Sequence, residues 1–378
     1  MEIKKLINEL KKNRLFYGLI LLIFILHLIT FPSIHHMGDE QLWLDIGKQV
    51  CEGNFTAFFS DVGDFSAHTP FYHLLLCASS PIHNFNLERA EIVAFIFLIF
   101  TIIGWYFSFP EKLKIDKKKF TLLLFSNSLL WIYSLRVLMD VPLAFFLSLG
   151  MFQLFLFFEY EKKKNYYISF ILLSLALLIK ESAIAFFPIF FIYLFFVKKL
   201  NVKNFILLLL PFVPYMFFIL YQYLSNYQVL WVFKVVFKVA GVDFSFIPYA
   251  NLPTAFYMIG TFGLGFLSCI LMWKKIGKEK VLNNFLMFSL ILYLVWEIVY
   301  DFVLWANLPR YHTTLIPFLT LLISEGSKKS KKMRYLYYLT LIFTLFSGFF
   351  ISYYFHTSSI EIWKKYSFLI DLIRKLRS

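Results

Sequence analysis

Long runs of apolar residues, separated by short polar connections, recur from one end of the sequence to the other. Most of them approach the roughly 17–25 residues with which a helix crosses about 30 Å of hydrocarbon. The pattern predicts an all-α polytopic membrane protein with about 11 transmembrane helices, in a range of about 10–13. The predicted spans are residues 15–31, 90–109, 120–135, 141–158, 166–179, 182–197, 204–224, 253–273, 283–300, 312–324 and 335–355.

Composition agrees with this pattern. Hydrophobic residues make up 60% of the chain, and the mean hydropathy is +0.70. Only 16% of the residues are charged, against about 25% in soluble domains. These values exclude a soluble globule, and we expect residues 1–378 to form a single integral membrane domain.

The positive charge is distributed as a topology signal. Of the 37 Lys and Arg residues, 25 lie in six clusters between spans, and these clusters alternate with connections that carry almost none. Because basic loops stay in the cytoplasm, the alternation predicts a cytoplasmic N-terminus in a cell (plasma or inner) membrane. It also explains the net charge of +14 without nucleic acid as a partner. We read the apolar run up to Phe31 as an uncleaved signal anchor.

The first extracytoplasmic loop, residues 32–88, is the most polar part of the chain. Leu42, Ile46 and Val50 are spaced four residues apart, which predicts one amphipathic helix, and Thr69-Pro70 predicts the start of a second. Both are expected to lie along the outer membrane surface. Residues 356–378 form a basic, amphipathic C-terminal tail, which eleven spans would place outside, against the charge rule.

Three cysteines occur, without a CxxC spacing, so the sequence indicates neither a zinc knuckle nor a disulfide framework. Cys51 and Cys77 lie in or beside the first outer loop and could pair. We favour free, buried thiols.

Ionisable residues near the ends of the predicted spans are candidates for function, because such residues are costly near hydrocarbon. On the predicted topology they collect on the outer side, whereas the inner loops are plain lysine runs. For any one of them, a loop charge or an ion pair remains the simpler interpretation. Together they predict one outward-facing site made from Asp39, Glu40, Arg89, Arg136, Asp140, Lys180, Glu181, Asp301, Arg310 and His312.

In their order along the chain, these residues resemble the motifs of the GT-C superfamily of membrane glycosyltransferases. The resemblance is to the protein O-mannosyltransferase and aminoarabinose-transferase-like branch, and it covers about residues 15–325. Each motif alone is weak, but all occur in order and on the same predicted side. They are GDE (Gly38 to Glu40), HTPFYHLLL, Arg89, LRVLMDVPLAFF (with Arg136 and Asp140), LALLIKESAIAF (with Lys180 and Glu181) and LPRYHTTLIPFL (with Arg310 and Tyr311).

The resemblance implies an inverting transfer of a sugar from a polyprenyl- or dolichyl-phosphate donor on the outer face. It makes Asp39 the general base, with Glu40 and Asp140 as further catalytic carboxylates. Asp140 would orient the acceptor or a metal. Asp39 could instead be a carboxylate that stabilises a helix N-terminus, and Asp140 an N-cap before Pro142. The candidates for binding substrate or lipid phosphate are Arg89, Arg136, Lys180, Glu181, Arg310, Tyr311 and His68. His68 would line the acceptor cleft, but a surface histidine is the simpler interpretation.

Several points stay open. Glu181 could simply pair with Lys180. No metal ligand spacing is present, so no metal residue is assigned, although His35, His36 and His73 with Glu40 could hold a divalent cation. The acceptor is a lipid, a glycan or a protein. Nothing after the last span resembles a soluble domain, which makes a protein acceptor the less favoured.

The rival interpretation is a transporter or lipid flippase without transferase chemistry. Transporters place their polar sites at the membrane midplane, often within inverted repeats. Here the ionisable residues lie at one rim and no repeat is evident. A third possibility is a scaffold protein without catalytic activity, in which these ionisable residues would not come together in one site.

Overall fold

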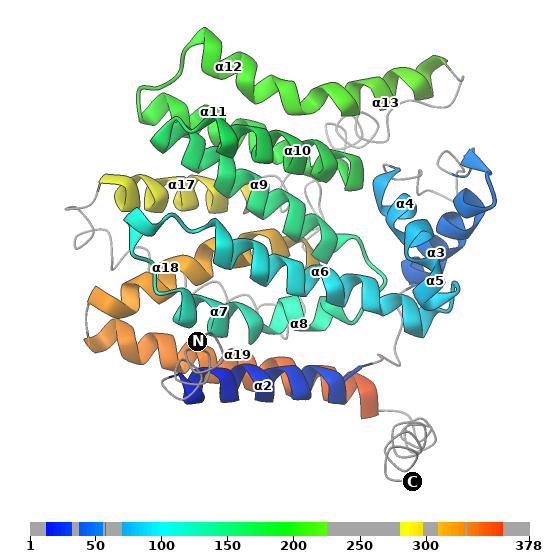
Figure 1. The fold of residues 1–378 in the computed structure, drawn as a ribbon, viewed down its shortest axis with the longest axis horizontal. Coiled ribbons are helices and arrows are strands. Elements are labelled where there is room, and N and C mark those ends of the chain that lie inside the picture. Colours follow the sequence, from blue (N-terminus) through cyan, green and yellow to red (C-terminus); the bar gives the residue numbers. More distant parts are fainter. Residues whose placement is uncertain are drawn as a thin grey trace, which may run out of the picture.

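The computed structural model describes residues 13–31, 38–55, 57, 70–224, 280–297, 309–329 and 331–357, and every regular element within them is helical (Figure 1). The elements up to the centre of the bundle are α2 (Arg14–Ile29), α3 (Gly38–Cys51), α4 (Phe71–Ala78), α5 (Ser80–His83), α6 (Leu87–Ser108), η2 (Glu111–Leu113), α7 (Lys117–Phe125), α8 (Ser128–Ser134) and α9 (Asp140–Tyr160). Those that follow are α10 (Lys163–Ile179), η3 (Glu181–Ala185), α11 (Phe186–Phe196), α12 (Val202–Leu209), η4 (Leu210–Phe212), α13 (Val213–Leu224), α17 (Lys280–Glu297), η7 (Pro309–Leu315), α18 (Ile316–Lys329) and α19 (Lys331–Thr357).

Three of the described helical stretches are long and apolar enough to cross a membrane: Leu87–Ser108, Asp140–Tyr160 and Val202–Tyr221. The apolar helices Arg14–Ile29, Glu181–Phe196 and Lys280–Trp296 are shorter. α9 lies at the centre of the bundle, with 89% of its apolar window buried, whereas only 17% is buried in Val202–Tyr221 at the periphery. The all-α membrane fold is therefore confirmed. The predicted span 253–273 and the tail from residue 358 onward lie outside the described residues.

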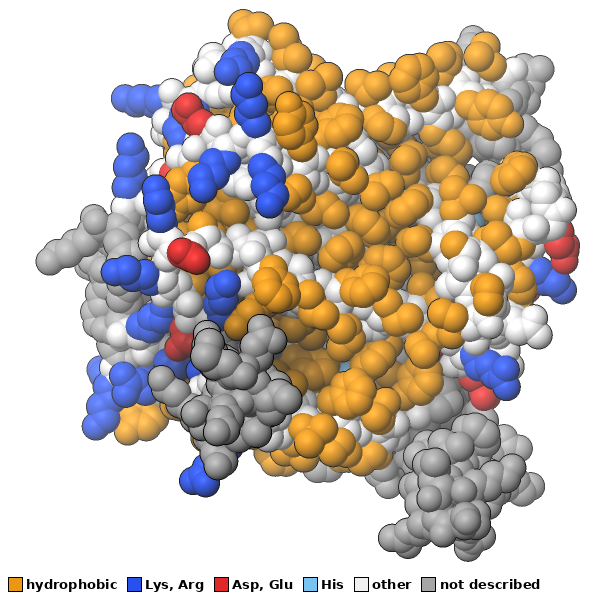
Figure 2. Space-filling view, in the orientation of Figure 1, with side chains coloured by type: hydrophobic (Ala, Val, Ile, Leu, Met, Phe, Trp, Pro, Cys, Tyr) orange, Lys and Arg blue, Asp and Glu red, His pale blue; other side chains and the backbone are white. Residues whose placement is uncertain are grey.

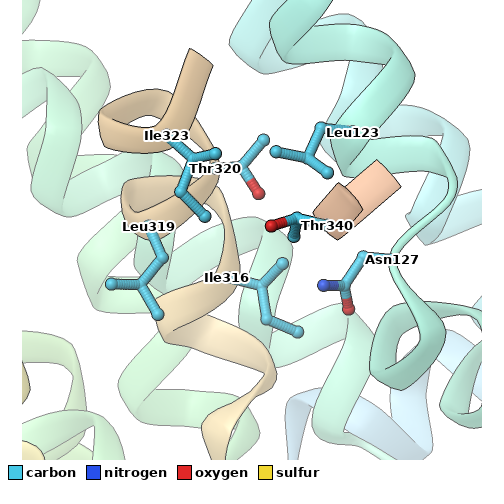
Figure 3. Close-up of a pocket in the computed structure, with 7 residues that line it drawn as sticks. All are labelled: Leu123, Asn127, Ile316, Leu319, Thr320, Ile323 and Thr340. Carbon is cyan, nitrogen blue, oxygen red and sulfur yellow. The ribbon is translucent and has the colours of Figure 1, made fainter. Parts of the chain in front are cut away.

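The short predicted span 120–135 is two helices, α7 and α8, divided at Ser126-Asn127. Asn127 stabilises this break between the helices. Its Oδ1 accepts hydrogen bonds from the N–H groups of Leu129 and Leu130 and so caps the N-terminus of α8. Beside the break, Asn127, Thr320 and Thr340 line a cavity of about 10 Å³ between α7, α18 and α19 (Figure 3). That is about the space of one water molecule, which would satisfy polar groups in an apolar surrounding.

The two ends of the bundle differ in charge. Lys and Arg side chains gather at one end, here called the basic end, and a broad apolar band covers the middle of the face shown (Figure 2). The helices α3, α4 and α5 lie together at the opposite end (Figure 1), here called the α3 end. This is the polarity that the alternating lysine clusters predict.

Buried carboxylates fasten helices together at the basic end. Glu325 of α18 accepts from the Asp116 N–H before α7 at 2.9 Å and pairs with Lys328 at 2.7 Å. Glu159 of α9 accepts from Tyr193 of α11 and from Asn284 of α17. These contacts join helices that are far apart in sequence.

The two helices predicted in the first outer loop are observed as α3 and α4. α3 is amphipathic, with Trp43, Leu44, Ile46 and Val50 buried and Asp45 exposed. The expectation of free thiols is wrong, because Cys51 and Cys77 form a disulfide between α3 and α4. Packing of these helices against each other brings the two Cα atoms to 5.2 Å, within the ordinary range for a disulfide. Sequence spacing alone gave no sign of that approach.

Candidate functional site at the α3 end of the bundle

The first buried ion pair joins α3 to the segment that leads into α9. Glu40 is 0% exposed, and its Oε1 lies 3.6 Å from Nη1 of Arg136. Its Oε2 accepts a hydrogen bond of 2.9 Å from the Val137 N–H. Both carboxylate oxygens are therefore engaged with residues 136 and 137, and Glu40 fixes this segment to the first turn of α3.

The second buried pair joins α9 to the end of α10. Asp140, 2% exposed, begins α9, and its Oδ1 lies 3.2 Å from Nζ of Lys180. Lys180 has an extended backbone (φ −157°, ψ 132°) between α10 and η3. Asp140 is not the N-cap that the sequence allowed, because Met139 holds that position. The carboxylate that pairs with Lys180 here is Asp140, at the start of another helix.

Tyr72 of α4 lies close enough to feel the charge of an acid from each pair. Its side chain is 1% exposed. Burial, together with the negative charges of Glu40 and Asp140, raises the pKa of the Tyr72 phenol well above its ordinary value. The hydroxyl therefore stays protonated and can act as a hydrogen-bond donor. Sequence reasoning missed Tyr72, although it lies within the HTPFYHLLL motif.

Arg136 is the group in this cluster with unused hydrogen-bonding capacity. Its side chain is 6% exposed, and among the described residues its Nε and Nη1 have no hydrogen-bond partner. Each such buried N–H costs about 1–3 kcal/mol when it is left unsatisfied. An anion with several acceptor oxygens, such as a phosphate, would remove this cost.

The short helix η7 also reaches the cluster. The hydroxyl of Thr313 in η7 donates to the backbone carbonyl of Asp140 at 3.3 Å. His312 beside it is fully buried. η7 therefore packs at the start of α9, as expected if the LPRYHTTLIPFL motif belongs to the site.

The remaining predicted residues are less defined. Arg89 is exposed in the first turn of α6, and Glu181 is half-buried at the start of η3. Asp39 lies in the first turn of α3, and Arg310 and Tyr311 lie in η7, but their side chains are outside the described set. His68 lies outside the described residues altogether.

Glu91 is a second residue that sequence reasoning missed. It lies in the second turn of α6 and is 0% exposed. An acid two residues after Arg89 inside an apolar span is itself a signal of function, because such residues are costly in hydrocarbon.

The described side chains do not form a set of ligands for a metal ion. Within residues 13–31, 38–55, 57, 70–224, 280–297, 309–329 and 331–357, no three His, Cys, Asp or Glu side chains converge. His73 is buried against Trp43 and Tyr72, with ring centroids 5.7 and 6.2 Å away. His35 and His36 lie outside this part of the chain.

Comparison with known proteins finds a similarity over part of the chain. Residues 67–222 match the family model described as dolichyl-phosphate-mannose-protein mannosyltransferase. No curated protein matches the chain.

Two solved structures share the fold. Both are ArnT from Cupriavidus metallidurans, one bound to undecaprenyl phosphate (TM-score 0.64, 11% identity) and one in the apo state (TM-score 0.57, 12% identity). The match covers 84% of this chain but only 61% and 60% of the ArnT chains, so this chain spans about three fifths of their length. By its fold and by residues 67–222, the chain resembles the GT-C membrane glycosyltransferases, as its motifs predict.

Proposed function

We propose that the protein is an integral-membrane glycosyltransferase that moves a sugar from a polyprenyl-phosphate carrier to an acceptor hydroxyl, with inversion, at the α3 end of the bundle. The observation that carries this proposal is the cluster of two buried ion pairs, Glu40–Arg136 and Asp140–Lys180. Two features of the relatives support it: the ArnT structure holds undecaprenyl phosphate, and the matched family model names a dolichyl-phosphate sugar.

The reaction needs one base and a stabilised leaving group. The acceptor oxygen forms a bond to the anomeric carbon as the bond from that carbon to the phosphate oxygen breaks. The acceptor proton passes to a carboxylate, and the polyprenyl phosphate leaves with additional negative charge. A positioned general base typically contributes about 10²–10⁴-fold to such a step.

We assign the base to Asp39. Both oxygens of Glu40 are engaged by Arg136 and Val137, and Asp140 is paired with Lys180. Those two acids therefore serve to position the cations, while Asp39 precedes them in the first turn of α3. Its role as base follows from the family resemblance.

Arg136 is the candidate for the leaving phosphate. Its Nε and Nη1 are buried without a hydrogen-bond partner among the described residues. A guanidinium presents parallel N–H groups that match two oxygens of a phosphate. Lys180 adds a second positive charge in its pair with Asp140, and Tyr72 adds a protonated hydroxyl that is influenced by both acids.

The described arrangement favours transfer over transport. A transporter site is expected near the midplane on broken helices. Glu40, Asp140 and Lys180 instead lie at helix ends, in the first residues of α3 and α9 and just beyond α10.

The test is a transfer assay with the purified protein in lipid nanodiscs and a panel of radiolabelled polyprenyl-phosphate sugars. Wild-type protein should release label from one donor, and the product should have the opposite anomeric configuration. Asp39→Asn should lower turnover at least ~100-fold. Asp45→Asn is the matched control, because Asp45 is exposed on the same helix and accepts only from Gln41 at 2.8 Å among the hydrogen bonds found for it.

Each result is decisive. If wild-type protein releases no label from any donor, the proposed activity is wrong. If Asp39→Asn turns over as fast as Asp45→Asn, the activity stands but the assignment of the base does not.

A further inference from the structure

An apolar trench lies on the side of the bundle, away from the α3 end. It runs between α2 and α6, and α7 forms its floor, because both helices pack on α7. It encloses about 290 Å³, roughly twice the ~150 Å³ of a cavity that takes up benzene. Its walls include Ile20 and Phe24 of α2, Ile99 and Ile103 of α6, and Phe125 of α7. Figure 2 shows the apolar face to which it opens.

The trench belongs to the half of the membrane next to the basic end. Its floor begins just after Lys117, Lys118 and Lys119, at the start of α7, and continues to Phe125. From Lys118 to Phe125 the helix rises about 10 Å at 1.5 Å per residue. One leaflet of a typical bilayer contributes about 15 Å of hydrocarbon. The trench therefore reaches about two thirds of the way into the hydrocarbon of that leaflet, deep enough for the upper part of a lipid acyl chain.

Three basic residues lie one helical turn before residues that line the trench: Lys117 and Lys118 before Thr121, and Arg14 before Tyr17. Nζ of Lys118 donates to Oδ1 of Asn13, which links α7 to the start of α2. Nζ of Lys117 lies 5.0 Å from the centre of the Tyr106 ring, and Arg14 is exposed in the first turn of α2. Asp116 nearby pairs with Lys119 at 3.7 Å, so it does not cancel the charge of the other three cations.

Thr121 supplies an independent sign of a polar ligand. It lines the trench, is 7% exposed, and its hydroxyl has no hydrogen-bond partner among the described residues. A helical threonine usually satisfies its hydroxyl at the carbonyl one turn earlier, as Thr101 does at Phe97 (2.7 Å). Thr121 lies about one turn deeper than the lysines, at the level where the ester carbonyls of a phospholipid lie.

We propose that this trench is a binding site for an anionic phospholipid. Lys117, Lys118 and Arg14 hold its phosphate, the Thr121 hydroxyl donates to an ester carbonyl, and one acyl chain fills the apolar walls. From the basic end inward, the basic residues, the unsatisfied hydroxyl and the apolar walls follow the same order as the phosphate, the ester carbonyl and the acyl chain of such a lipid. The site is separate from the transfer chemistry, so it does not rest on the proposed function.

The test measures binding of phosphatidylglycerol to the delipidated full-length protein by native mass spectrometry, with phosphatidylcholine as the neutral comparison. The wild-type protein should retain one phosphatidylglycerol and bind it at least tenfold more tightly than phosphatidylcholine. Ile103→Trp should fill the trench and reduce binding at least tenfold, whereas Ile342→Trp, at a similarly exposed isoleucine on α19, should not. Thr121→Val should weaken binding about fivefold, the effect of one lost hydrogen bond, and the control Thr101→Val should not.

Three outcomes would overturn the site: no phospholipid retained by the wild-type protein, equal affinity for the two lipids, or unchanged binding in Ile103→Trp. An effect of Thr101→Val as large as that of Thr121→Val would show that the hydroxyl acts through the fold and would remove Thr121 from the site.

Discussion

The disulfide between Cys51 and Cys77 should control the stability of α4 and, through it, the site. The bond closes a loop with a sequence separation of 26 residues. In the chain-entropy treatment, closing a loop of that size contributes about 3.5 kcal/mol at 25 °C. Every 1.4 kcal/mol is a tenfold change, so local unfolding of α4 should become about 300-fold more favourable without the bond.

Hydrogen–deuterium exchange of residues 71–78 in nanodiscs measures this effect. The double variant Cys51→Ser/Cys77→Ser should exchange these amides up to about 300-fold faster than the wild-type protein. Cys269→Ser is the control, because it removes the third cysteine and leaves the bond intact. Transfer should fall in the double variant as well, because α4 carries Tyr72, which lies close to Glu40 and Asp140.

Thiol counting checks the premise. The denatured, unreduced wild-type protein should react with one equivalent of maleimide, and the reduced protein with three. Three reactive thiols before reduction would show that the bond does not form. Exchange within about twofold of wild type in the double variant would show that packing alone holds α4.

Three further outcomes follow from the same region. Glu40→Gln should destabilise the protein by about 3–5 kcal/mol, measured by denaturant titration, because Arg136 keeps a buried charge without its partner; an unchanged midpoint would contradict this. Gly47→Ala should separate α3 from α4 and cost about 1–3 kcal/mol, since a Cβ there would lie 2.9 Å from Leu76 Cβ; a stability equal to wild type would show that Leu76 moves aside. Burial lowers the pKa of His83. The stability contributed by the neutral imidazole is therefore complete above the unfolded pKa of about 6.5 and is lost as the pH falls below that value. Hydrogen–deuterium exchange of residues 80–86 should accelerate below that pH in the wild type and not in His83→Gln.

The apolar, all-helical character and the charge polarity of the bundle could be predicted because they depend on local, additive properties. Each apolar run forms a helix whose backbone hydrogen bonds are all internal, and each lysine cluster determines the side of the membrane on which its own loop lies. The division of 120–135 into α7 and α8 also had a local signal, since Asn127 is a strong N-cap within a run that is short for a span. The lengths of α3 and α4 follow from their own periodicity and stop signals.

Partner choice could not be predicted in the same way. Lys180 is adjacent to Glu181 in sequence, yet its extended backbone ends α10 and brings its Nζ to Asp140, forty residues earlier in the chain. Glu40 meets Arg136 and Val137 across 96 and 97 positions, because the start of α3 lies beside the segment that leads into α9. Sequence order identified these residues as candidates but could not say which carboxylates are already engaged. That distinction carries the mechanism, since an acid whose two oxygens are both engaged, as those of Glu40 are, positions Arg136 and leaves the acceptor proton to another carboxylate.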